Sequence, residues 1–312
     1  MPHHSLLRPF WPMSMAMVAA LTAPLAAQAD TGKLKLTGGI SSLEGAAGGG
    51  ISPWATIGTQ ASEGEVGVSA HVSRAVTRDY GMTATGVAVG IHDKLELSVG
   101  HQDFNTGDTG ILLGLPGLRL SQTMVGAKLR LAGEAVLDSD NLMPQIAVGV
   151  VHKRLASSGL DGTLAALGAQ RSGTDLYVSA TKLLLAQGIL VNGTLRATKA
   201  NQGGLLGFGA TLNGANNGYT LQPEISVAYL LSPQLAVGFE YRAMPDKLKR
   251  AGAGAGLGDG LAADDWKDIF VVWAPSKNLS FTLAYVDLGR IVPATTAARK
   301  QRGVYLSAQA GF

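Results

Sequence analysis

The sequence predicts an all-β protein, a transmembrane, antiparallel, up-and-down β-barrel of about 12–14 strands. Segments in which apolar and polar residues alternate recur along the chain, and the last one, residues 303–312, ends on the terminal Phe312. Strict alternation is typical of a strand with one apolar and one polar face. Glycine is abundant, at 42 residues, and charged residues make up only 15% of the chain. About 25% is typical of soluble domains.

Residues 1–29 have the features of a cleaved signal peptide. Arg8 is the only charged residue in this stretch, an apolar run extends from Met13 to Leu25, and Ala27-Gln28-Ala29 matches a small-x-small cleavage site. The run is shorter than the ~20 apolar residues that a membrane-spanning helix needs. We therefore expect cleavage rather than an anchor, and a barrel domain over residues 30–312.

Residues 30–60 have two interpretations. Residues 33–36 alternate and residues 51–59 could form a strand, so this stretch could be a first barrel hairpin with EGAAGGG at its tip. It could equally be a plug folded back into the lumen, because glycine permits close backbone contact. We favour the hairpin. The plug candidates are Glu44, Gly45, Gly48, Gly49 and Gly50.

From residue 63 the alternation is regular, and about twelve strands follow. In the first half, the apolar positions are Val66, Val68, Ala70 and Val72; Thr85, Val87, Val89 and Ile91; Leu95, Leu97 and Val99; and Val125, Ala127, Leu129 and Leu131. In the second half they begin with Ile146, Val148 and Val150; Leu176, Val178 and Ala180; Ile189, Val191 and Leu195; and Ile225, Val227 and Tyr229. They end with Leu235, Val237, Phe239 and Tyr241; Ile269, Val271 and Trp273; Leu279, Phe281, Leu283 and Tyr285; and the alternate positions of 304–312.

The connections alternate in length. Short turns are expected near His92, Asp140, Gln187, Ser232 and Ser276, with longer loops such as 105–117 and 156–173 between them. Outer-membrane barrels have short periplasmic turns, long outer loops and an even number of strands. The closing strand that ends on Phe312 resembles the C-terminal signal of Gram-negative outer-membrane barrels. We therefore expect the outer membrane as the location, with its lipid, lipopolysaccharide and the barrel-assembly machinery as partners.

The composition argues against other classes of protein. A formal net charge of +3, without a basic block interleaved with aromatics, gives no sign of nucleic-acid binding. The absence of cysteine excludes a disulfide framework. A soluble β-sandwich also alternates, but it covers itself with charge. The low charge, the predicted signal peptide and the terminal Phe312 together favour the barrel.

No motif predicts catalysis, a cofactor or a metal. EGAAGGG lacks the Gly-Lys-Ser/Thr of a phosphate loop, and residues 252–260 suit a flexible outer loop. Asp138-Ser139-Asp140-Asn141 lacks the glycine and distal glutamate of a calcium loop. An outer-membrane enzyme would need a Ser–His or Asp–His cluster, and the histidines at 71, 92, 101 and 152 are scattered. Asp264 and Asp265 are interpreted as solvated loop charges.

The charged residues of the strands are the main candidates for function. If the apolar faces contact lipid, polar-face charges must point inward, because a charge on the lipid face at mid-depth costs ~2–4 kcal/mol. These pore-lining candidates are Glu65, His71, Glu96, Lys128, Arg130, Arg196, Glu224, Glu240 and Arg242. Either they pair across the strands and fill the interior, or they line a wet path that selects solutes by charge.

Three segments resemble an uncharacterised family of Gram-negative proteins known as a domain of unknown function. They are LTGGISSLEGAAGGGISPWATIG (36–58), GIHDKLELSVGHQDF (90–104) and KLRLAGEAVLDSDNLMPQIAVGV (128–150). The resemblance implies an outer-membrane barrel and carries no activity or catalytic residue.

We expect a narrow or gated passive channel for small solutes. The alternative is a closed barrel with a structural or adhesive role through its outer loops. An open channel predicts that Lys128, Arg130, Glu224 and Arg242 are accessible to solvent, whereas closure predicts that they are paired and protected.

Overall fold

The structure is a computed structural model that describes residues 33, 35–36, 39–136 and 142–312. The predicted signal peptide (residues 1–29) lies outside the described residues, as do residues 138–141 of the turn expected near Asp140. No helix among the described residues is long and apolar enough to cross a membrane.

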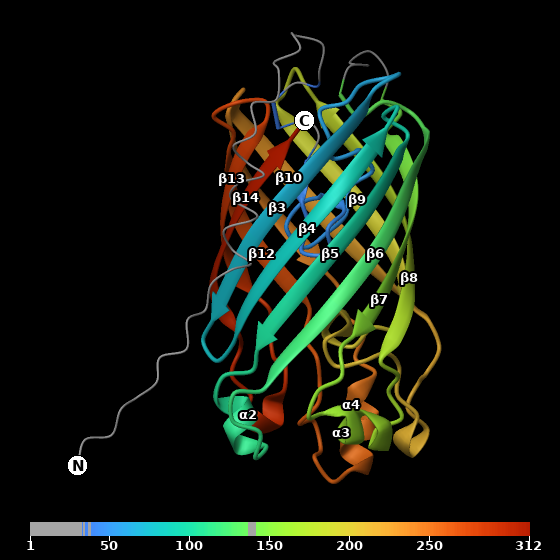
Figure 1. The fold of residues 1–312 in the computed structure, drawn as a ribbon, viewed down its shortest axis with the longest axis vertical. Helices are drawn as coiled ribbons and strands as arrows, with labels where there is room; N and C mark the ends of the chain where they lie inside the picture. The colour runs from blue at the N-terminus through green and yellow to red at the C-terminus, as the bar shows by residue number, and fades with distance from the viewer. Residues whose placement is uncertain (1–32, 34, 37–38, 137–141) are drawn as a thin grey trace, which may run out of the picture. The chain divides into compact units, whose positions relative to one another are not determined.

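Within the described part of the chain, twelve antiparallel strands close a barrel (Figure 1). Each strand pairs with its neighbours in sequence, and the last strand pairs with the first, so that Ala308 lies opposite Val72. The strands are β3 (Val66–Thr77), β4 (Gly81–Ile91), β5 (Leu95–Asn105), β6 (Arg119–Ala132), β7 (Gln145–Leu155), β8 (Ser172–Leu184), β9 (Ile189–Thr198), β10 (Thr220–Ser232), β11 (Leu235–Arg242), β12 (Trp266–Trp273), β13 (Leu279–Asp287) and β14 (Arg302–Gly311). The predicted all-β, up-and-down barrel is confirmed.

The alternation separates an apolar outer face from a mostly buried inner face. On β13, the side chain of Leu283 is 52% exposed, whereas Thr282 and Ala284 are each only 4% exposed. Most other predicted apolar positions follow the same rule, for example Val99 on β5 and Ile269 on β12, but Ala310 near the end of β14 is only 6% exposed. Phe312 extends this pattern, because its backbone N–H and C=O bond to Val68 of β3.

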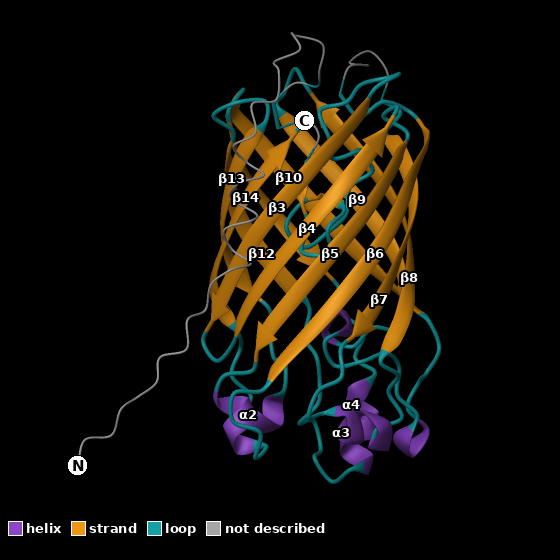
Figure 2. Cartoon of the chain, viewed as in Figure 1, coloured by secondary structure: helices purple, strands orange, loops and turns teal. Residues whose placement is uncertain are grey.

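The two ends of the barrel differ (Figure 2). At one end, called the turn end, the strands are joined by connections such as residues 92–94 and 233–234. At the other end, called the loop end, longer connections carry α2 (Asp108–Leu112), α3 (Asp161–Ala166) and α4 (Leu248–Gly254). Three short 3-10 helices, η1 (Gln202–Gly204), η2 (Leu212–Gly214) and η3 (Pro293–Thr295), also lie in these connections.

The glycine-rich segment 252–260 lies at the loop end, and its first part is helical. The α4 helix covers residues 248–254, and its Ala251 is fully buried beside Leu248, Leu167 and Ala210. The expectation of a loop was wrong for residues 252–254, where small Gly and Ala side chains let the helix pack closely against neighbouring loops, whereas residues 255–260 form a connection without regular structure.

The N-terminal segment does not add strands to the barrel wall. Residues 40–60, called the plug below, lie inside the barrel (Figure 1, blue). Within it, β1 (Ile40–Ser41) and β2 (Ala47–Gly48) form a separate two-stranded sheet. The favoured first hairpin, and with it the count of fourteen strands, is therefore wrong, and the plug interpretation describes the segment.

Candidate functional site: the plugged lumen

The central feature of the lumen is one carboxylate of the plug held by three cations of the wall. Glu44 Oε1 lies 2.6 Å from Lys153 Nζ on β7 and 2.9 Å from Arg242 Nη2 on β11. Glu44 Oε2 lies 2.9 Å from Arg196 Nη1 on β9. A single plug residue is therefore bonded to three strands at once.

Two wall carboxylates complete the central cluster. Asp175 on β8 lies 2.8 Å from Lys153 Nζ and 3.3 Å from Arg196 Nη1. Glu224 on β10 lies 2.5 Å from Arg196 Nε and 3.5 Å from Arg242 Nε. The cluster thus contains three anions and three cations, all buried. Charges removed from water persist only when they are paired and hydrogen-bonded in this way.

The environment of Glu44 stabilises its charged form. Burial alone raises the pKa of a carboxyl group, but Arg196, Arg242 and Lys153 together hold the pKa of Glu44 well below its usual range. Glu44 is therefore an ionised anchor at neutral pH.

A second anchor lies on β5 and β6. Glu96 Oε1 accepts the backbone N–H of Ala47 at 3.0 Å, and its Oε2 accepts the N–H of Gly58 at 2.7 Å. Lys128 Nζ lies 3.1 Å from Glu96 Oε1 and donates to the Ala47 carbonyl at 3.1 Å. These two wall side chains therefore hold two separate points of the plug backbone.

A third anchor lies on β11, where Glu240 Oε2 accepts the N–H of Ile51 at 3.0 Å. Ser226 donates to Glu240 Oε1 at 2.7 Å and accepts from Trp54 Nε1 at 3.0 Å. Glu240 also presses on Gly49 so closely that a Cβ at that position would overlap the carboxylate. A larger residue at position 49 would therefore displace the Glu240 carboxylate from its bonds to Ile51 and Ser226.

Uncharged wall side chains bind the remaining plug backbone. Thr194 Oγ1 donates to the Pro53 carbonyl at 2.8 Å, and Thr181 Oγ1 accepts from the Ala55 N–H at 2.8 Å. Gln145 donates to the Ala55 carbonyl at 2.7 Å, and Gln102 donates to that of Leu43 at 2.8 Å. Strands around the barrel therefore bind the plug backbone through polar contacts, while Ile40, Leu43, Ile51 and Trp54 of the plug belong to the buried apolar core.

Cavities lie on both sides of the plug. The outer cavity, of about 620 Å³, lies towards the loop end and has Leu43, Gly50 and Ile51 of the plug in its lining. The inner cavity, of about 570 Å³, lies towards the turn end, and its lining includes Thr56 and Ile57 of the plug. The plug thus separates two spaces along the barrel axis.

The structure places seven of the nine pore-lining candidates on the inner face of the wall, buried: His71, Glu96, Lys128, Arg196, Glu224, Glu240 and Arg242. The prediction that Glu65 points into the lumen was wrong. It precedes β3, is exposed and accepts hydrogen bonds from Ser62, so the alternation of β3 does not extend to it. Arg130 lies near the turn end, half-buried, where it pairs with Asp93 and Glu134.

The plug candidates lie within the plug. Gly45 has a φ of +93°, a left-handed conformation that glycine adopts without strain, and it sits against the backbone of Gly100. Gly48 pairs with Ile40 in the small sheet, and Gly50 lies beside Glu240 and lines the outer cavity.

The sequence analysis missed Lys153 and Asp175, both in the central cluster, and Asp268 beside Glu240. A signal for them existed. Each occupies an inward position of an alternating strand. Asp175 and Asp268 have the apolar outward neighbours Leu176 and Ile269, whereas Lys153 lies between the outward polar residues His152 and Arg154. Tyr177, also inward, stacks its ring beside the Arg196 guanidinium at 5.5 Å.

The histidines are separated from one another. His71 is buried on the inner face, and neither of its ring nitrogens has a hydrogen-bond partner among the described residues. His101 and His152 are exposed on the outer face, where they bond to Thr123 and Thr174. Asp264 and Asp265 are paired rather than merely solvated, with Arg290 and with the Tyr241 hydroxyl. Within the described ranges, no group of three acidic or histidine side chains is placed to hold a metal ion.

A family model described as a protein of unknown function, DUF3034, matches residues 37–309 of this sequence. The chain belongs to the DUF3034 family. This match covers the plug and the barrel wall as far as Gln309 in β14, so both are features of the region that defines the family. No curated protein matches the chain.

Solved structures similar to this DUF3034 chain include outer-membrane barrels of several kinds. The KdgM porin in complex with oligogalacturonate has 10% identity and a TM-score of 0.47, covering 78% of this chain and 99% of the porin. The COG4313 outer membrane channel from Pseudomonas putida F1 has 11% identity and a TM-score of 0.43, covering 81% and 97%. Outer membrane phospholipase A from Escherichia coli has 8% identity and a TM-score of 0.42, covering 79% and 92%.

Proposed function

We propose that this protein is an outer-membrane channel for small solutes that is closed when the plug is docked and opens when the plug moves. The observation that carries the proposal is the pair of cavities, one on each side of the plug. A barrel that served only as a scaffold has no need of two spaces in line with each other. The apolar outer face and the terminal Phe312 support the outer membrane as the location, with lipid and lipopolysaccharide around the wall and the assembly machinery as a folding partner.

The way the plug is bound suits movement. Many of its contacts with the wall are hydrogen bonds and ion pairs, and water can replace such contacts when the plug leaves. Ile40, Leu43, Ile51 and Trp54 of the plug also belong to the buried apolar core, so their exposure adds a cost that scales with the apolar area. The inward charges that remain, among them Lys128, Arg196 and Glu224, would then line the path.

A closed barrel with a structural or adhesive role is the second candidate. One observation favours it: Lys128, Glu224 and Arg242 are buried and paired, as closure predicts. Neither candidate involves catalysis.

Conductance across a planar bilayer separates the two candidates. The mature chain and a variant lacking residues 44–50 are each refolded, and closure of the barrel is confirmed by heat-modifiable migration on a gel. We expect rare openings of the intact chain and steady conductance of the variant. Silence from both folded proteins would overturn the channel and favour the closed barrel.

A further inference from the structure

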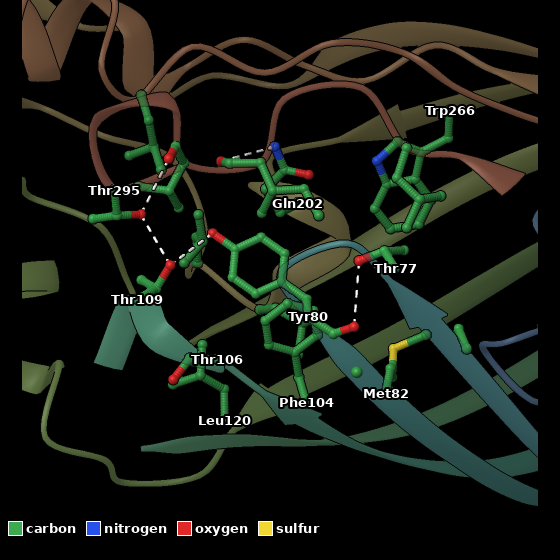
Figure 3. Close-up of a pocket in the computed structure, with 18 of the residues that line it drawn as sticks. Thr77, Tyr80, Met82, Phe104, Thr106, Thr109, Leu120, Gln202, Trp266 and Thr295 are labelled. Atoms are coloured by element: carbon green, nitrogen blue, oxygen red, sulfur yellow. Dashed lines mark hydrogen bonds between the residues drawn. The ribbon is translucent and has the colours of Figure 1, made fainter. Parts of the chain in front are cut away.

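The outer cavity has the size of a small-molecule site. Its volume of about 620 Å³ falls in the range of ~300–1,000 Å³ that is usual for such pockets. Three structural regions enclose it: the inner wall near the loop end, the plug, and the long loops (Figure 3). Each loop helix contributes a leucine to the lining, Leu112 from α2, Leu164 from α3 and Leu248 from α4.

The lining is mostly apolar and carries no cationic side chain among the described residues. It consists mostly of leucine, alanine and aromatic side chains, with Tyr80 and Phe104 in contact at a ring-centroid distance of 5.1 Å. No lysine, arginine or histidine belongs to the residues that line it, whereas Glu240 and Asp268 do. Such a lining suits an apolar molecule and disfavours a carboxylate or phosphate, because a buried anion needs a cationic or hydrogen-bonding partner.

Three buried polar atoms on this lining are unpartnered. Trp266 Nε1, Asp268 Oδ1 and Gln202 Oε1 have no hydrogen-bond partner among the described residues, and their side chains are at most 6% exposed. Other lining groups are satisfied: the hydroxyls of Tyr80, Thr109 and Thr295 form a chain with 3.0 Å links (Figure 3). Buried polar groups are normally paired, so these three mark where a ligand or water bonds.

The unpartnered atoms indicate which polar group a ligand of this cavity would carry. The Trp266 indole offers a donor and Gln202 Oε1 an acceptor, while the Asp268 carboxyl group accepts when ionised and can also donate when protonated. A hydroxyl both donates and accepts, so it can satisfy an acceptor and the indole N–H together. An alkane satisfies neither, and a carboxylate finds no cation among the described lining residues.

We propose that the outer cavity binds an uncharged, hydrophobic molecule that carries a hydroxyl group. Binding of such a molecule does not depend on the proposed function. Its identification as the solute that the channel transports rests on the proposed function. The same molecule would touch the plug, because Leu43, Gly50 and Ile51 line the cavity and Glu240 bonds to Ile51.

Quenching of tryptophan fluorescence by a brominated probe tests the proposal. The full mature chain is placed in lipid nanodiscs with Trp273→Phe, because Trp273 is 49% exposed on the outer face and would report probe dissolved in lipid. The probe is 10-bromodecan-1-ol, and its matched controls are 10-bromodecanoate at alkaline pH and 1-bromodecane. We expect saturable quenching by the alcohol, and binding about tenfold weaker for both controls.

Cavity filling gives the second arm. Ala284 faces the cavity from β13, so Ala284→Phe fills part of it, whereas Leu283→Phe places the same ring on the outer face. We expect Ala284→Phe to weaken alcohol binding about tenfold and Leu283→Phe to leave it unchanged. Heat-modifiable migration checks that both fold, and the comparison of probes on the parent protein needs no cavity variant.

Three results would overturn the proposal: quenching that rises linearly without saturation, binding of the carboxylate as tight as that of the alcohol, or equal binding by folded Ala284→Phe and its control. Conductance without ligand is measured separately. A cavity that binds nothing in a protein that conducts leaves the channel intact, and a cavity that binds in a silent protein leaves only the ligand site.

Discussion

The middle of the lumen and its outer part are lined by the same alternating strands, yet they are filled in opposite ways. In the middle, charged side chains such as Arg196 and Glu224 are buried on the inner face and paired, and Arg196 also bonds to Glu44 of the plug. In the outer part, Phe104, Leu120 and Phe270 leave a cavity of about 620 Å³. The middle of the lumen is filled by polar contacts with defined geometry, whereas the apolar lining of the outer part leaves space for a ligand.

The comparison also shows how two neighbouring strands serve both regions. Glu240 on β11 bonds to the plug, whereas its neighbour in register, Asp268 on β12, has an unpartnered oxygen among the described residues. Both carboxyl groups line the outer cavity, so the boundary between the plugged and the hollow part of the lumen lies at this pair.

Removal of the central anchor, Glu44, should have the largest effect on closure of the middle of the lumen by the plug. In Glu44→Gln, Lys153, Arg196 and Arg242 face only Asp175 and Glu224, and breaking a buried ion pair on one side costs about 3–5 kcal/mol. We expect plug docking to weaken by this amount, seen as a large rise in the open fraction in bilayer recordings. The control is Glu63→Gln at an exposed position. An open fraction equal to that of the control would contradict the role of the central cluster.

The second anchor should have a smaller effect, and one that a partner change can reverse. In Glu96→Gln one of two backbone N–H groups loses its charged acceptor, at a cost of about 1.5–3 kcal/mol. The double variant Glu96→Gln with Lys128→Met removes the unpaired cation too, so we expect its open fraction to lie closer to that of the parent. Strictly additive effects in this cycle would rule out the coupling between the two side chains.

A loop ion pair outside the plugged region should matter least for closure. Asp264 accepts from Arg290 Nε at 2.9 Å and Nη2 at 2.6 Å, but both side chains are partly exposed. We expect Asp264→Asn to cost up to about 1 kcal/mol, seen as faster proteolysis of the loops. Bilayer recordings should show an unchanged open fraction, and a rise comparable to that of Glu44→Gln would show that the loops also close the path.

The pH response should follow the lowered pKa of Glu44. A group whose pKa is lowered in the docked state stabilises docking above its ordinary pKa, and this contribution is lost as the pH falls through the lowered value. Recordings should show no increase in opening down to the ordinary glutamate range near ~4.3, and an increase only below it. Opening that begins between neutral pH and ~4.3 in the parent but not in Glu44→Gln would contradict this protonation state of Glu44.

The barrel wall could be predicted because its signal is local. On residues 279–285 the apolar face reads directly from alternate positions, and β13 places Phe281 and Leu283 outward as expected. Glu65 shows the limit of this rule, since alternation has meaning only where the chain is extended, and Glu65 lies in a turn with Ser62.

The plug could not be chosen from the sequence because its contacts are distant along the chain. Glu44 bonds to Lys153, Arg196 and Arg242, which lie 109, 152 and 198 residues away. Such long-range contacts leave no periodic pattern in the sequence. The outer cavity was missed for a related reason. Leu112 and Leu248 lie in the long loops, where apolar residues do not alternate as in a strand, and only the closed barrel brings them together.

The most direct test of the central claim follows plug position and conductance in the same protein. The natural sequence contains no cysteine, so Ala46→Cys provides a single thiol at a plug residue that is 3% exposed. Its reaction with a water-soluble maleimide reagent is measured in the parent and in Glu44→Gln, alongside bilayer recordings of both. If the docked plug closes the lumen, the thiol is protected in the parent, which opens rarely, and reacts in the conducting variant. Conductance with a thiol that stays protected would contradict the account.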